Sequence, residues 1–414
     1  MPPRRDDPSG RRVASRERSL RRQRRVFAYR DSIPPVRRRD RRSWPVAVLC
    51  LVCLWLAGCV SPRGDEAAAL LADIAAGDGP SRLKETTPAP ARSTIRYTGR
   101  MSDAAIADLY QPGEAPRGAV VVVPGLTPYG KDDPRLVAFG QSLARSRFLV
   151  LIPEIANTRA LRVSAADSAI IADAIEELAR RFAGGAERSV GLVAISFGAG
   201  PALLAAGETP AGRLVRFVVT IGGYYDIDAA IGFATTGVYR ATDGSWVHAA
   251  PNDYGAFVFL RGNAERLRDP ADRMLLIAIA ERRLADPNAD IAGLVARLGP
   301  EGRAVYALVA NRDPLLVPGL IARLPEAIRE ELRRLDLEGR ALPFLAGPVF
   351  VVHGEDDTMI PAGESTKLAA ALGRRAELYV VERFAHVDAG TATLGDSLRL
   401  WNAAIRILEE RDQP

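Results

Sequence analysis

The sequence predicts an α/β protein whose mostly parallel central sheet is covered by helices. Short runs rich in β-branched residues alternate with amphipathic segments from about residue 93 to the C-terminus. The composition, 48% hydrophobic and 26% charged, is that of a folded globular domain rather than a disordered or fibrous chain. A third observation is a mainly helical stretch of about 120 residues between Tyr225 and Phe344, which indicates an insertion within the alternating pattern.

The predicted strands are short and mostly apolar, as is typical of strands buried on both faces of a sheet. Two of them, Ser93–Arg100 and Ala104–Tyr110, form a pair, and the others follow as Ala119–Val123, Phe148–Ile152, Ser189–Ile195, Phe217–Ile221, Pro348–Val352 and Ala376–Val381. Helices are predicted from apolar residues at helical spacing, several with Ser or Asp at the N-cap. They are Asp133–Arg145, Ser164–Phe182, Phe197–Ala206, Ser365–Leu372 and Ser397–Glu410.

The insertion spans residues 226–344 and divides the predicted core into 93–225 and 345–414. Its periodicity predicts helices over 269–285, 290–298 and 316–335. An insertion near the carboxyl ends of parallel strands lies over the crevice where α/β sheets bind ligands, so we expect a cap or lid. A second packing domain with no role in ligand access is the alternative.

The positive charge of the chain is concentrated at its N-terminus. Residues 1–58 carry 16 Arg and 5 acidic residues, whereas the remainder carries 40 basic and 45 acidic residues. The body is therefore mildly acidic, and an argument for an anionic partner applies only to the first segment. Because that segment lacks interleaved aromatic residues for base stacking, a nucleic-acid arm is the disfavoured interpretation and no nucleic-acid partner is expected.

An apolar run of 15 residues, 44–58, follows the Arg-rich region and predicts a secretory signal, since a spanning helix needs about 20 residues. The junction Leu56-Ala57-Gly58-Cys59 resembles the bacterial lipobox, which implies that Cys59 receives a lipid and becomes the first mature residue. An uncleaved anchor helix is the alternative. The 43 residues before Trp44 are unusually long for a signal, and we expect the true start to lie later, for example at Val36.

The predicted partner of this anchor is a membrane of the cell envelope. Val60 follows the Cys where an Asp, by resemblance to Gram-negative lipoproteins, favours the inner membrane, so outer-membrane sorting is expected. Residues 59–92 are rich in Ala, Gly, Pro and Ser with one short helical candidate, Asp65–Ala76, and predict a flexible tether. The other cysteines, Cys50 and Cys53, lie in the removed segment, so we expect no disulfide and no thiol chemistry in the mature protein.

The sharpest chemical signal is the segment 190–200, Val-Gly-Leu-Val-Ala-Ile-Ser-Phe-Gly-Ala-Gly, in which an apolar strand runs into small residues and a helix. This is a nucleophile-elbow pattern, because the tight turn exposes the Ser196 hydroxyl at a helix N-terminus and demands tiny neighbours. Gly198 meets that demand, and Ala194 replaces the more usual glycine.

With this motif the chain resembles the α/β-hydrolase family over about residues 93–410, and the resemblance implies an acid and a histidine later in the chain. The segment 353–361, His-Gly-Glu-Asp-Asp-Thr-Met-Ile-Pro, is similar to the family's acid loop, whose register selects Asp357. Neighbouring Asp356 is the first alternative, and Asp226, after an earlier strand, is the second.

Three histidines compete for the role of base. His248 lies in the insertion and His353 directly precedes the acid loop, whereas His386 follows the last strand, 29 residues beyond Asp357, where the family's histidine loop belongs. The resemblance therefore implies a Ser196, Asp357, His386 triad. It also implies an oxyanion hole made by the backbone N–H groups of Phe197 and Leu126, although Pro124 stands where the family usually has a His.

The loop 125–131, Gly-Leu-Thr-Pro-Tyr-Gly-Lys, matches most of a phosphate-binding P-loop. Asp132 argues against that interpretation, because the position requires a Ser or Thr hydroxyl for magnesium. The sequence contains neither a metal-binding cluster nor a dinucleotide fingerprint, so we expect no metal and no cofactor.

Together these observations predict a lipid-anchored serine hydrolase that cleaves a small or lipid-like carboxylic ester. A peptidase or acyltransferase on the same fold is the first alternative, because ester and amide chemistry share the triad. A non-catalytic envelope lipoprotein with a vestigial triad is the second.

Overall fold

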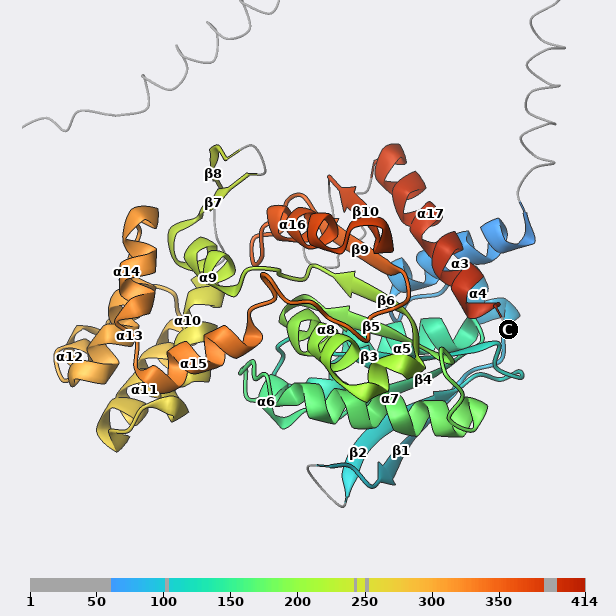
Figure 1. Ribbon diagram of the computed structural model, residues 1–414, viewed down its shortest axis with the longest axis horizontal. Coiled ribbons are helices and arrows are strands. Elements are labelled where there is room, and N and C mark those ends of the chain that lie inside the picture. The colour runs from blue at the N-terminus through green and yellow to red at the C-terminus, as the bar shows by residue number, and fades with distance from the viewer. Residues whose placement is uncertain (1–60, 101–103, 242–243, 250–252, 383–392, 414) are drawn as a thin grey trace, which may run out of the picture. The chain divides into compact units, whose positions relative to one another are not determined.

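The computed structural model describes residues 61–100, 104–241, 244–249, 253–382 and 393–413, which belong to one compact unit, Val60–Pro414. Its centre is an eight-stranded sheet (Figure 1). The strands are β1 (Ala91–Tyr97), β2 (Ala105–Gln111), β3 (Gly118–Val123), β4 (Phe148–Pro153), β5 (Val190–Ile195), β6 (Val215–Ile221), β9 (Val349–Gly354) and β10 (Ala376–Val381). The predicted α/β class is confirmed, and each predicted strand is present with its ends shifted by a few residues at most.

The strand order is β1-β2-β4-β3-β5-β6-β9-β10. β2 pairs antiparallel with β1 and β4, and the pairs from β4 to β10 are parallel. The carboxyl ends of β3, β5, β6, β9 and β10 therefore lie along one edge of the sheet, where the loops that follow them meet.

Alternate residues of each central strand face two different layers of helices. Val120 and Val122 of β3 pack with the helices α5 (Pro134–Arg145), α17 (Leu394–Arg411) and α3 (Pro62–Ala76). Val121 and Val123 pack with α7 (Asp167–Ala183), α8 (Ala199–Glu208) and α16 (Ala362–Leu372). β3 is buried along its whole length because both of its faces are covered.

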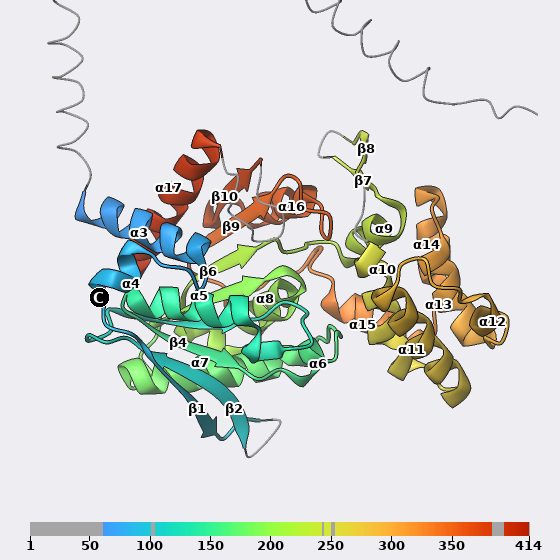
Figure 2. The same ribbon diagram turned by 180° about the vertical axis from the view of Figure 1, so that it is seen from behind.

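The expectation of a flexible tether over 59–92 is wrong for the described part of that segment, although the short helix expected over Asp65–Ala76 is present as α3. α3 and α4 (Arg82–Thr86) are folded, and α3 lies beside α17 and α5 (Figures 1 and 2). Ser61 caps α3 by accepting a hydrogen bond from the Gly64 N–H at 3.1 Å, and Gly77 ends it with a φ of 53°. The Ala-rich composition resembled a linker, but Ala67 and Leu70 supply a buried stripe on this helix.

The chain between β6 and β9 forms a mainly helical layer at one end of the sheet (Figure 1). It contains α9 (Ile227–Thr236), β7 (Val238–Arg240), β8 (Trp246–His248), α10 (Asp253–Asn263), α11 (Pro270–Ala285), α12 (Ala292–Val295), α13 (Pro300–Ala310), α14 (Val317–Ala322) and α15 (Glu326–Leu335). The predicted helix 316–335 is two helices, because Pro325 cannot continue the first one. The predicted helix 290–298 shrinks to α12, and α9, α10 and α13 were not predicted.

The helices of this layer share their apolar core with one face of the sheet. Ile231, Leu260 and Val305 belong to the same buried cluster as Leu203 of α8 and Val351 of β9. We call residues 226–344 the cap. None of the helices in the described part of the chain combines the length and the apolar character needed to cross a bilayer.

Candidate active site

Ser196 stands at the sharp turn between β5 and α8. β5 ends at Ile195, residues 196–198 form one turn of 3-10 helix, and α8 begins at Ala199. The backbone φ of Ser196 is 54°, a left-handed value that is uncommon for a residue with a side chain. This is the strained conformation that the elbow motif predicts, and it lies at the edge where the strand carboxyl ends meet.

The tiny residues around Ser196 are required by close backbone approaches. A Cβ atom at Gly198 would lie 2.5 Å from the carbonyl oxygen of Pro124. A Cβ atom at Gly125 would lie 3.2 Å from the Cβ of Ser196 itself. Ala194 is fully buried in β5, so its methyl group is accommodated where the motif usually has a glycine.

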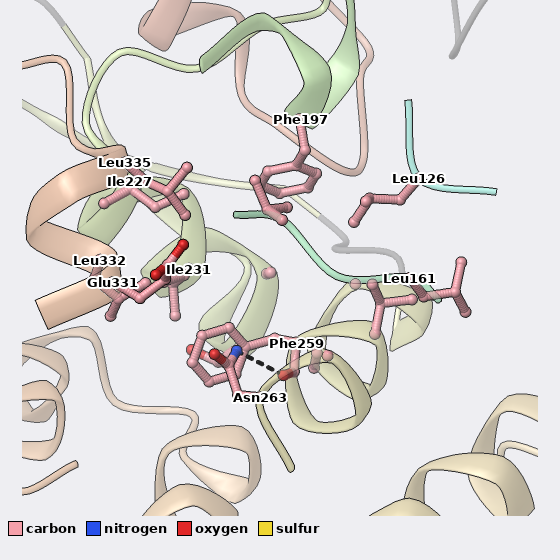
Figure 3. A pocket seen from close by; sticks show the side chains of 17 residues that line it. Leu126, Leu161, Phe197, Ile227, Ile231, Phe259, Asn263, Glu331, Leu332 and Leu335 are labelled. Carbon is pink, nitrogen blue, oxygen red and sulfur yellow. Dashed lines mark hydrogen bonds between the residues drawn. The ribbon is translucent and has the colours of Figure 1, made fainter. Parts of the chain in front are cut away.

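The expected oxyanion loop, which follows β3, lies directly against this turn. Gly125 packs on Ser196, and the next residue, Leu126, lines the same cavity as Phe197. Figure 3 shows the side chains of Leu126 and Phe197 facing that cavity from two different segments of the chain. The structure therefore brings Ser196, Phe197 and Leu126 close together, as the sequence predicts.

Asp357 is held rigidly in the loop after β9. It is 6% exposed, and its Oδ1 atom accepts hydrogen bonds from the backbone N–H groups of Met359 at 2.7 Å and Ile360 at 3.1 Å. Its Oδ2 atom lies against Gly222, where an added Cβ would be 3.2 Å away. The Oδ1 atom thus fixes the carboxylate to the backbone of its own loop, and the Oδ2 atom lies near the end of β6.

The two alternative acids are placed differently. Asp356 is exposed. Asp226 caps α9, its Oδ1 atom accepting a hydrogen bond from the Ala229 N–H at 2.9 Å. Burial and backbone anchoring therefore favour Asp357 among the three candidates.

His353 supports the acid loop. It is completely buried, with Nδ1 2.6 Å from Ser365 Oγ and Nε2 2.9 Å from the carbonyl oxygen of Ile360. Since a carbonyl can only accept, Nε2 carries the proton and Nδ1 accepts from the hydroxyl. The same Nε2 atom is 3.5 Å from Asp357 Oδ2, so the ring ties both ends of the loop together.

His386 lies in residues 383–392, outside the described part of the chain, so its distance from Ser196 and Asp357 is not measured. Val381 at the end of β10 pairs with Gly354 at the end of β9, so these two strands end at the same edge of the sheet. His248 is exposed on β8.

The loop that resembled a P-loop has a structural role for its lysine. Lys131 is buried, and its Nζ atom lies 3.2 Å from Asp108 and 3.1 Å from Asp132. An ammonium group paired with two carboxylates does not present a free charge to a phosphate. Within the described ranges, His, Cys, Asp and Glu side chains form no group suited to a metal ion.

A narrow cavity of about 60 Å³ lies between the cap and the segments that carry Leu126 and Phe197. Its walls are mostly apolar and come from α9, α10 and α15 of the cap, together with Leu126, Leu161, Val163 and Phe197 of the core (Figure 3). The polar groups at its edge are already engaged. Asn263 donates to the Phe259 carbonyl at 2.9 Å, and Glu331 accepts from Ser164 Oγ at 2.9 Å and from the Ala165 N–H at 2.7 Å. The cavity therefore offers apolar surface next to the expected oxyanion hole.

No protein-family model matches the chain, and no curated protein matches it significantly. Among solved structures, the chain is similar to the esterase domain of a Rhodothermus marinus protein, with 14% identity, a TM-score of 0.41, and coverage of 77% of this chain and 96% of that one. It is also similar to the Pyrococcus horikoshii acylaminoacyl peptidase (14% identity, TM-score 0.40, 78% of this chain), but it spans only 42% of that chain's length. A Pyrobaculum calidifontis esterase has 15% identity and a TM-score of 0.39, with coverage of 89% and 97%.

The fold is assigned from the sheet itself. Its order, its single strand antiparallel to both neighbours, and the sharp strand-to-helix turn at Ser196 are the features on which the assignment rests. The eight-stranded, mostly parallel sheet with its flanking helices is the α/β-hydrolase fold.

Proposed function

We propose that this protein is a serine hydrolase that cleaves carboxylic esters through an acyl-enzyme on Ser196. The observation that carries the proposal is the left-handed backbone of Ser196, φ 54°, at the junction of β5 and α8. Such strain persists only where the surrounding structure enforces it, and it is typical of a nucleophile that must project from a turn. Gly125 and Gly198 make this turn possible by letting the oxyanion loop touch it.

In the proposed mechanism His386 removes the proton from the Ser196 hydroxyl as the oxygen attacks the ester carbonyl. Asp357 holds the imidazole in the tautomer that can accept this proton and stabilises the cation that forms. The carbonyl oxygen, now negative, is stabilised by the N–H groups of Leu126 and Phe197. His386 then protonates the departing alkoxide, and a water molecule, deprotonated by the same ring, releases the acid and regenerates Ser196.

The ester preference is part of the proposal. The cavity beside Leu126 and Phe197 is narrow and mostly apolar, which suits a slender acyl chain. Peptide cleavage and transfer of the acyl group to an acceptor other than water use the same groups, so they are alternative outcomes of the test below.

The same Ser→Ala substitution at two positions tests the proposal. The Ser196→Ala enzyme should lose hydrolysis of short and medium acyl esters, and the Ser397→Ala enzyme, changed at an exposed serine of α17, should match the wild type. An ester panel, a matched amide panel and a set of acyl acceptors assayed on the wild type decide among hydrolase, peptidase and transferase. A folded wild type that acts on none of them contradicts the proposal and favours a non-catalytic envelope protein.

We also propose that Cys59 carries the lipid that anchors the enzyme in the cell envelope, with the outer membrane as the expected site. The support is the sequence Leu56-Ala57-Gly58-Cys59, which lies outside the described residues. The Cys59→Ala variant should no longer incorporate a labelled fatty acid, and its signal segment should remain uncleaved. Unchanged incorporation, or a signal segment retained in the wild type, contradicts the proposal.

A further inference from the structure

A second, wider hollow meets the active-site turn on the side of the sheet covered by α3 and α5. Its volume is about 450 Å³, several times that of the cap cavity. Ser196 itself lines this hollow, whereas the cap cavity is lined by its neighbour Phe197, and Leu126 lines both. We call the wider hollow the α3 groove.

The walls of the α3 groove are partly apolar and partly polar. Ile74, Ala75 and Gly77 come from α3 and its end, while Leu136 and Phe139 come from α5. The polar part is a small network in which Thr127 donates to Asp133 at 2.8 Å and Arg135 contacts the same carboxylate at 3.1 Å. The Arg135 side chain is 80% exposed, whereas Thr127 and Asp133 are buried beneath it.

We infer that the α3 groove binds the leaving-group half of the substrate, with α3 as a wall that selects it. This inference rests on the proposed hydrolase function. During an acyl-enzyme reaction the acyl half stays bound, while the alcohol must depart and water must reach the same carbon. A narrow apolar cavity suits the half that stays, and a wide, partly polar groove lined by Ser196 suits the half that leaves and the water that replaces it. The predicted substrate class is an ester that joins a slender acyl group to a bulky alcohol with both apolar and polar parts.

α3 is fixed well enough to act as such a wall. Asp73, next to Ile74, is completely buried and accepts hydrogen bonds from Ser142 of α5 at 2.6 Å and from Lys84 at 2.7 Å. Near the other end of the helix, Trp401 of α17 donates to the Gly64 carbonyl at 2.8 Å. Anchors near both ends leave α3 little freedom to move away from the groove.

Two exposed alanines of α3 provide a matched pair of variants. Ala75 lines the groove and Ala72, three residues earlier, does not, yet both are exposed on the same helix, so a larger side chain at either leaves the core unchanged. In Ala75→Trp the indole should obstruct the groove. We expect kcat/KM for a naphthyl ester, relative to the methyl ester of the same acid, to fall about tenfold or more, the size of effect that steric misfit in a pocket produces.

In Ala72→Trp the same ratio should stay within about twofold of the wild type. The dependence on acyl chain length, measured with methyl esters, should be unchanged in both variants. An Ala75→Trp enzyme with an unaltered alcohol ratio overturns the inference, and so does one in which acyl-length preference changes instead. A wild type that neither cleaves esters nor reacts with a fluorophosphonate overturns the proposed function, which is a distinct result from the loss of alcohol selectivity alone.

Discussion

The single residue on which the site depends is Ser196, whose left-handed backbone costs about 1–3 kcal/mol for a residue with a side chain. The packing of β5, α8 and the loop after β3 maintains this conformation. Gly198 is central to that packing because its α-carbon faces the Pro124 carbonyl oxygen with no space for a methyl group.

Gly198→Ala should therefore move the loop that carries Leu126. An added Cβ would stand 2.5 Å from the Pro124 oxygen, and the backbone rather than a flexible side chain would have to yield. We expect kcat for ester hydrolysis to fall by about 10²- to 10³-fold, as when one oxyanion donor is lost. Gly293→Ala, at a glycine with no atom within 4 Å of the new methyl, should leave kcat unchanged. Equal activity in the two variants would contradict this account of the loop.

Substitutions at two adjacent aspartates, Asp356 and Asp357, test which of them is the acid of the proposed triad. Asp357→Asn should lower kcat by about 10⁴-fold, because an amide in this position stabilises the wrong imidazole tautomer. The Asn oxygen can still accept from Met359 and Ile360, so the fold should be retained. Asp356→Asn, at the exposed neighbour, should change kcat by less than about twofold in the same steady-state assay. The reverse ranking would assign the acid to Asp356.

Individual site residues could be predicted from the sequence where a motif specifies both the residue type and its position. The spacing around Ser196 predicted the turn, and the register of the family resemblance selected Asp357 over Asp356 as the acid; the structure buries Asp357 and leaves Asp356 exposed. The role of His353 was not predictable, because its contacts with Ser365 and Ile360 depend on where α16 packs.

Among the secondary-structure elements, α3 was predicted as a short helix over Asp65–Ala76, but its packing against the rest of the protein was not predicted. The partners that bury Asp73 are Ser81 and Lys84, which lie close in sequence, and Ser142, which is 69 residues away. Contacts of the last kind cannot be read from local periodicity.

Asp73→Ala should lower the free energy of unfolding by about 1–3 kcal/mol, because Lys84 and Ser142 lose a buried acceptor. Burial alone raises the pKa of Asp73, but hydrogen bonds from Lys84, Ser142 and Ser81 outweigh it and hold the pKa below its ordinary 3.8. The contribution is therefore fully present above about pH 4 and is lost as the pH falls through the native pKa. Denaturant unfolding should show the difference from wild type at pH 7 and a smaller one at the lowest pH at which the protein folds.

The control for this prediction is Asp78→Ala, at an exposed carboxylate just beyond the end of α3. Its free energy of unfolding should stay within about 0.5 kcal/mol of the wild type at both pH values. A loss in Asp73→Ala no larger than this control would show that α3 is not fixed by its buried aspartate.

In the cap, too, local sequence patterns predicted some helices and missed others. α11 was predicted because Asp269 and Pro270 mark its start and its apolar residues repeat at helical spacing. α9 and α10 are apolar around much of their circumference, so they lack a polar face that would have revealed a helical period. Their burial against the sheet and the other cap helices explains why such a composition is stable.

On the scale of the whole molecule, the cap and the sheet share one apolar core, and the narrow cavity lies where they meet. Two cap glycines probe this cavity. Gly255 lines it and Gly232 does not, and in both an added methyl would stand 3.4 Å from its nearest neighbour, an ordinary contact. Both glycines lie in helices, so Gly→Ala should be tolerated at either position.

Gly255→Ala should shift the preference for acyl length by about one methylene towards shorter chains, a change of about 1 kcal/mol in relative kcat/KM between adjacent chain lengths. Gly232→Ala should leave the profile unchanged. The measurement is kcat/KM across a homologous series of esters of one alcohol. If both variants keep the wild-type profile, the acyl chain does not occupy this cavity.

We propose that the Ser196 oxygen is an activated nucleophile, and covalent labelling of the folded protein with a fluorophosphonate, with the labelled site located by mass spectrometry, tests this. We expect one adduct per molecule on the peptide that contains Ser196, its loss in Ser196→Ala, and its retention in Ser397→Ala. A natively folded wild type that stays unlabelled, or a label that persists in Ser196→Ala, would contradict the account.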